Sequence, residues 1–72
     1  MFELAVGQVL EFFEPVTSNG EVIAKGTRVR VGFIWSELSE EKVSIVVMDE
    51  QPPRTLTVAR HIVTLHCQPV TA

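Results

Sequence analysis

The chain has 72 residues, of which 46% are hydrophobic, and it carries a net charge of −3 with a pI near 5.2. A chain of this length can bury one core but not two, so we expect a single domain over residues 1–72. The lone Cys67 excludes an intrachain disulfide and a cysteine-rich zinc site, and the acidic balance argues against a large phosphate-binding face. We expect no cofactor.

The N-terminus has no basic stretch followed by an apolar segment, and no apolar run approaches the roughly 18 residues of a membrane span. We therefore expect a cytoplasmic protein. The high apolar content predicts that part of its surface meets another protein, in the first place a second copy of the chain.

The first predicted strand covers residues 8–14, which are rich in β-branched and aromatic residues, and Pro15 ends it. Residues 17–20 form a predicted turn, because Asn19 and Gly20 both tolerate the positive φ angles that tight turns need. Residues 21–24 follow as a short extension.

Residues 25–35 show the clearest pattern in the chain, an alternation of period two that predicts a strand with one buried face. The alternating set is Thr27, Val29, Val31, Phe33 and Trp35, with Arg28, Arg30 and Ile34 pointing the other way. Gly32 lies within this strand and marks a candidate bulge or bend. The charged residues 36–42 then predict an exposed loop with one helical turn capped by Ser36 or Ser39.

Residues 43–48 predict a third strand that is apolar on both faces at Val46 and Met48, so it is either central or covered by a partner. The hairpin loop 49–53 contains two prolines, which cannot donate to a ladder. Residues 55–58 predict a fourth strand. The alternation breaks at 59–62, which predicts a single 3₁₀ turn, and resumes at 63–67 in the last strand.

This order of elements resembles the SH3-like barrel, most clearly over residues 55–65, which look like the strand, turn and closing strand of such barrels. Residues 25–31 look like the glycine-initiated strand that opens their sheet. The resemblance implies an all-β fold, a five-stranded SH3-like barrel with one short 3₁₀ turn before the last strand. It implies no function, because one fold carries many functions.

Three groups of small barrels can be compared with the chain. Proline-peptide-binding SH3 domains use several tyrosines and a tryptophan pair, whereas this chain has no tyrosine and a single Trp35. Nucleic-acid-binding barrels of the KOW type are resembled faintly at residues 26–32. The small plasmid-borne dihydrofolate reductase has similar dimensions, but residues 55–58 lack its glutamine and tyrosine, so its activity is not carried over. A weaker resemblance is to small acidic proteins of mobile gene cassettes.

Candidate chemical sites are few. His61, His66 and Cys67 do not suit a metal, because the adjacent strand residues 66 and 67 point to opposite faces. The carboxylate pairs at 40–41 and 49–50 lie in predicted loops and indicate solvated charge, and no serine lies in a strained glycine-flanked turn. The four aromatic residues could build a cage for a methylated ammonium group, with Glu11 or Glu14 supplying charge; they are Phe12, Phe13, Phe33 and Trp35.

The favoured hypothesis is a non-enzymatic interaction module that forms a dimer or tetramer. A barrel filled by Val29, Val31, Phe33, Ile45, Val47, Leu56, Val58, Val63, Leu65 and Cys67 leaves other apolar residues outside. The predicted interface consists of Ile34, Val46, Met48, Trp35 and Phe13, with the orientation of Phe12 and Phe13 left open. The alternatives are an enzyme or small-ligand binder with a site shared between subunits, and a KOW-like nucleic-acid-binding barrel.

Overall fold

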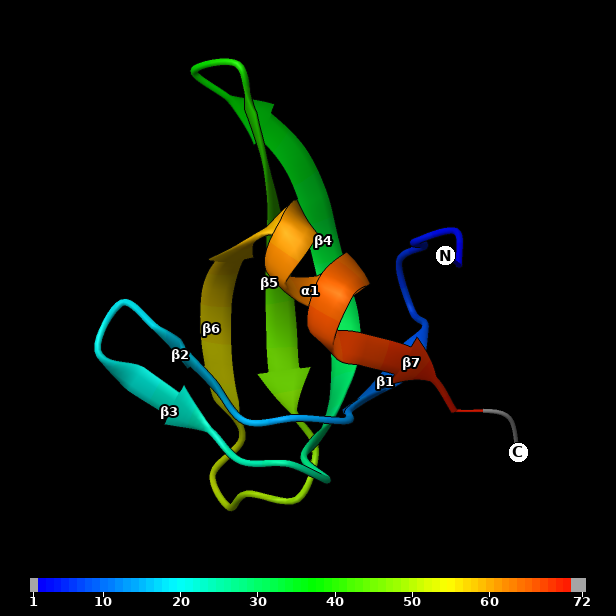
Figure 1. Ribbon diagram of the computed structural model, residues 1–72, viewed down its shortest axis with the longest axis vertical. Coiled ribbons are helices and arrows are strands. Elements are labelled where there is room, and N and C mark those ends of the chain that lie inside the picture. Colours follow the sequence, from blue (N-terminus) through cyan, green and yellow to red (C-terminus); the bar gives the residue numbers. More distant parts are fainter. Residues whose placement is uncertain (1, 71–72) are drawn as a thin grey trace.

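Seven strands and one short helix account for most of residues 2–70, the part of the chain that the computed structural model describes (Figure 1). Five strands form an antiparallel sheet in the order β6-β5-β4-β1-β7, and β2 and β3 form a separate hairpin. The elements are β1 (Val9–Phe12), β2 (Val16–Ser18), β3 (Glu21–Ile23), β4 (Arg28–Glu37), β5 (Glu40–Val47), β6 (Arg54–Ala59), α1 (Arg60–His66) and β7 (Cys67–Pro69).

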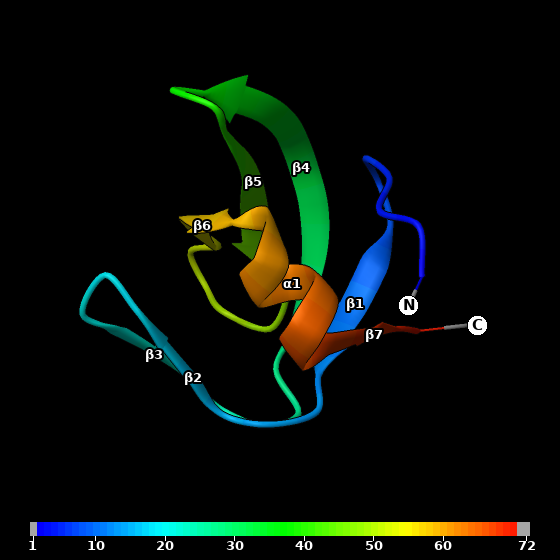
Figure 2. The same cartoon turned by 45° about the horizontal axis from the view of Figure 1, so that its top comes forward.

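The fold is mostly β, as the sequence predicted, but the sheet does not close on itself within the described residues. Its two edges, β6 and β7, are not paired with each other. The sheet instead curls around the core, with β4 strongly bent and the β2–β3 hairpin facing β6 (Figure 2). The hairpin turns at Asn19 and Gly20, whose φ angles of +51° and +79° confirm the predicted turn.

A β-bulge at Gly32 decides which aromatic residues reach the surface. The pairing of β4 with β5 shifts between Val31 and Phe33. Val31 pairs with Ile45 and both are buried, whereas Phe33 is 61% exposed. Since the extra residue reverses the alternation, Ile34 packs against the core. The predictions that Phe33 fills the core and that Ile34 lies outside are therefore wrong, for this reason.

The predicted loop at residues 36–42 is wrong, because both strands continue through it. Glu37 pairs with Glu40, and only Leu38 and Ser39 remain as the turn. Both residues have positive φ angles, +49° and +66°, as a type I′ turn requires. The β4–β5 hairpin consequently forms an arm that extends beyond the other strands (Figure 1).

Residues 60–66 form an α-helix, which corrects both the predicted 3₁₀ turn and the predicted strand over 63–67. Ile62 and Val63 turn toward the core from α1, which lies beside β5, β6 and β7, and Val63 is fully buried. Leu65, expected in the core, is 54% exposed, because helical geometry points it away from Val63. Within residues 2–70, no helix has the length and apolar character needed to cross a bilayer.

The core lies between the sheet, α1 and the β2–β3 hairpin. Phe12 is fully buried and Phe13 is 42% exposed, which settles the orientation of this pair. The core consists of Leu4, Leu10, Phe12, Val16, Ile23, Val29, Val31, Val43, Ile45, Val47, Val58, Val63 and Cys67. Leu56, also expected there, packs against it while partly exposed.

Candidate functional site

The side of the sheet that faces away from the core carries an apolar surface on β4 and β5. We call Phe33, Trp35, Val46 and Met48 the outer-face patch. The rings of Phe33 and Trp35 lie 5.7 Å apart, centroid to centroid, at an angle of 37°. Val46 is half-buried on β5, and Met48, just beyond the end of β5, is 38% exposed. Three of the five predicted interface residues thus belong to this patch.

The bulge shapes the middle of the outer-face patch. A Cβ atom added at Gly32 would lie 3.6 Å from the Ser44 carbonyl oxygen and 4.0 Å from Cγ2 of Val46. A side chain at position 32 would therefore lie against Ser44 and Val46 of β5, and the glycine leaves these residues uncovered next to Phe33. Phe33 pairs with Ser44, so Val46 is its diagonal neighbour across the two strands, within reach of a large side chain.

Charged groups of both signs border the outer-face patch. Arg30 pairs with Val46, and Lys42 pairs with Trp35. The indole nitrogen of Trp35 donates to a carboxylate oxygen of Glu37 at 3.4 Å. This contact orients the ring along the arm, and Leu38 at the tip of the arm is 94% exposed. The arm therefore combines an apolar centre with a polar border, the arrangement found in many protein interfaces.

The structure separates the other two predicted interface residues from this patch. Ile34 packs against the core on the opposite side of the sheet. Phe13 lies just beyond the pairing of Glu11 with Arg28, at the far end of β4 from Trp35, and its N–H donates to the His66 carbonyl oxygen at 3.1 Å. Sequence reasoning missed Phe33, which it assigned to the core. The glycine directly before Phe33 marks a candidate bulge, and the pairing of β4 with β5 establishes it.

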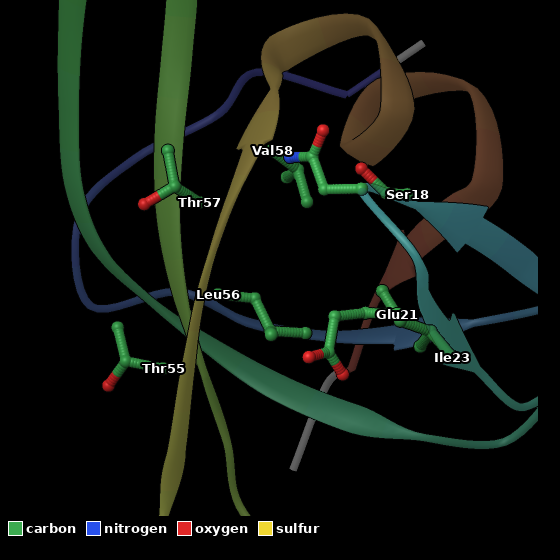
Figure 3. Close-up of a pocket in the computed structure, with 8 residues that line it drawn as sticks. Ser18, Glu21, Ile23, Thr55, Leu56, Thr57 and Val58 are labelled. Carbon is green, nitrogen blue, oxygen red and sulfur yellow. The ribbon is translucent and has the colours of Figure 1, made fainter.

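A cleft lies between β6 and the β2–β3 hairpin, where the curled sheet remains open (Figure 3). Its volume is about 280 Å³. Leu56 points into it from β6, facing Glu21 and Ile23 of β3 (Figure 3). It is lined by Ser18, Asn19, Glu21, Ile23, Thr55, Leu56, Thr57 and Val58.

A second hollow of about 350 Å³ lies between the turn of the arm and α1. It is lined by Phe2, Ser39, Glu40, Glu41, Arg60, His61 and Thr64. Arg60 and Glu41 form an ion pair within it. This contact joins α1 to β5, so the charges of the hollow support the fold.

The candidate metal residues are not brought together. His61 is exposed, His66 pairs through Nδ1 with Glu14, and Cys67 is buried. Within residues 2–70, no group of three or more histidine, cysteine and acidic side chains could hold a metal ion. Burial removes water from the Cys67 thiol and raises its pKa to about 12, so it stays protonated at neutral pH and is a poor nucleophile.

Three of the four acidic residues in the predicted carboxylate pairs, Glu40, Glu41 and Glu50, form surface ion pairs. Glu40 contacts Lys42 at 3.6 Å, and Glu50 contacts Arg54 at 2.9 Å. The aromatic cage is not assembled, because Phe12 is in the core and Phe13 lies far along β4 from Trp35. Its two candidate acids have other contacts, since Glu11 pairs with Arg28 at 3.2 Å and Glu14 pairs with His66.

Comparisons of the chain with protein families, with curated proteins and with solved structures found no match.

Proposed function

We propose that this chain is a non-enzymatic interaction module that pairs with a copy of itself through the outer-face patch. The observation that carries the proposal is the aromatic pair on the arm, in which Phe33 is 61% exposed and Trp35 is half-buried beside it. Aromatic side chains supply much of the binding energy of protein interfaces, because they bury a large area with few rotatable bonds.

A second copy suits this surface better than a partner of one charge. Arg30 and Lys42 border the patch together with Glu37. Under a two-fold axis, each surface meets its own image, so a border with both signs of charge can pair with itself. Two-fold dimers are also the commonest closed assemblies of soluble proteins.

The patch is not needed to complete the core of one chain. The exposed surface of the chain is 4604 Å². A folded monomer of 8.0 kDa is expected to expose about 4,500 Å². Since a single copy already buries the usual share of its surface, a variant that cannot associate should still fold.

The architecture of the module is proposed to be a small SH3-like barrel. Support comes from the strongly bent β4 of the five-stranded sheet, from the β2–β3 hairpin opposite β6, and from the short helix just before the last strand (Figure 2). In this arrangement β6 and the hairpin are the two sides of the remaining opening.

The test is the mass of the protein in solution, measured by sedimentation equilibrium from the low micromolar to the high micromolar range. We expect the wild type to reach twice the mass of the chain and Phe33→Asp to remain a monomer. Val22→Asp is the matched control, because Val22 is 65% exposed on β3 and lies outside the patch. A wild type that stays monomeric throughout, or a Phe33→Asp variant that associates like the wild type, contradicts the proposal.

A further inference from the structure

None of the four residues of the outer-face patch lines the cleft beside β6. We propose that this cleft binds an extended segment of a partner protein, which adds to the sheet as a strand along β6. The segment presents apolar side chains to Leu56 and Ile23 and a basic side chain to the acidic end of the cleft.

Of the two edges of the sheet, β6 is the one open to strand addition. The opposite edge, β7, has only three residues and includes Pro69, and short strands and prolines both protect an edge from further pairing. β6 has six residues, Arg54–Ala59, with no proline or glycine among them. Among the described residues, no backbone hydrogen bond connects β6 to the hairpin across the cleft.

The strand register identifies the backbone groups that are free to pair. The Met48 N–H donates to the Arg28 carbonyl oxygen at 3.0 Å, so residue 48 directs its backbone groups toward β4. Successive residues of an antiparallel strand bond alternately to either neighbour, so every second residue of β5 bonds to β6; these are Val43, Ile45 and Val47. Their partners on β6 are Val58, Leu56 and Arg54. Thr55 and Thr57 therefore direct their N–H and C=O groups to the open edge.

The shape of the cleft agrees with this assignment. Thr55 and Thr57 line the cleft, yet their side chains point away from it, whereas Leu56 points into it (Figure 3). It is therefore the backbone of these two threonines that borders the space. The volume of about 280 Å³ is at the lower limit for a ligand site and suits a short extended segment.

The charge of the cleft indicates the chemistry of the segment. The guanidinium group of Arg54 contacts the carboxylates of Glu21 at 2.7 Å and Glu50 at 2.9 Å. Two carboxylates share one positive charge, so one negative charge remains at this end. A lysine or arginine of the incoming strand would neutralise this negative charge, whereas an acidic residue would be repelled by it.

The direct test uses a fluorescein-labelled ten-residue peptide of alternating valine and threonine with one central lysine, and its binding is followed by fluorescence anisotropy. Thr57→Pro removes the N–H group that we assign to the open edge, and proline is tolerated at such a position. Thr57→Val is the matched control, because it changes only a side chain that points away from the cleft. We expect the wild type and Thr57→Val to bind alike and Thr57→Pro to bind about tenfold more weakly.

A second measurement needs no variant. Hydrogen exchange at the Thr55 and Thr57 amides, followed by NMR, should be fast in the free protein and slow when the peptide is added. Replacing the lysine of the peptide with glutamate should weaken binding. Absence of binding together with unchanged exchange at both amides overturns the proposal.

The mass of Thr57→Pro in solution separates this site from the outer-face patch. Thr57 is opposite Ser44, the partner of Phe33, so its side chain lies beside the outer-face patch and Thr57→Val is again the control. We expect both variants to associate as the wild type does. A Thr57→Pro variant that becomes a monomer while Thr57→Val still associates shows that a second copy occupies the edge of β6, and overturns the assignment of a partner peptide. Failure of self-association in the wild type leaves the peptide site standing.

Discussion

Replacing Val31 and Phe33 in turn with aspartate tests the bulge at Gly32. The two residues are two positions apart on β4, so a regular strand would bury both. In the structure, Val31 is only 1% exposed, whereas Phe33 is 61% exposed. The two substitutions introduce the same charge on the same strand, but on opposite sides of the sheet.

The expected costs differ several-fold. For 72 residues, the total free energy of unfolding is about 4 to 11 kcal/mol. Val31→Asp loses the burial of a valine and leaves an unpaired charge in the core, a cost of about 5 kcal/mol or more. Little more than a third of the surface of Phe33 is buried, so Phe33→Asp loses little apolar burial and costs about 1 kcal/mol.

Urea unfolding followed by circular dichroism measures both costs, at a protein concentration low enough that association does not contribute. Val31→Asp should be largely unfolded without urea. The midpoint of Phe33→Asp should fall by no more than about 1 M. Equal destabilisation by the two substitutions would show that the strand alternates without interruption and would refute the bulge.

Two further predictions concern the turn of the arm and the buried thiol. Replacing Leu38 and Ser39, with φ angles of +49° and +66°, by Asn and Gly should relieve backbone strain. The expected gain of about 1 kcal/mol raises the melting temperature by about 4 to 8 °C, and an unchanged value would contradict the turn geometry. The fold raises the pKa of Cys67 from its ordinary 9.0 to about 12, so it favours the protonated thiol. This contribution to stability is intact below about pH 9 and is lost as the pH rises toward 12. The free energy of unfolding of Cys67→Ala should therefore fall less between pH 9 and pH 12 than that of the wild type. The same fall in both proteins would count against the burial of the thiol.

The sequence predicted most strands correctly, because alternation reports directly on a sheet with one buried face. It failed where one residue changes the geometry. A glycine within a strand can form a bulge or simply remain in register, and only the pairing with β5 decides between them. Phe33 and Ile34 were therefore placed on the wrong sides.

Two other elements failed for different reasons. Residues 62–65 contain Ile62, Val63 and Leu65, a spacing too short to separate a helix from a strand. The turn at Leu38 and Ser39 has neither glycine nor asparagine, so its composition gives no hairpin signal. The cleft beside β6 could not be predicted at all, because it depends on how the β2–β3 hairpin lies relative to the edge of the sheet.

Trp35 is the only tryptophan of the chain, so its fluorescence reports on the outer-face patch alone. The most direct test of self-association is the emission maximum of Trp35 measured during serial dilution from the high micromolar range. We predict a shift toward longer wavelength on dilution, as the indole becomes exposed to water, and no such shift in Phe33→Asp. An emission maximum that is independent of concentration in the wild type would contradict association through this surface.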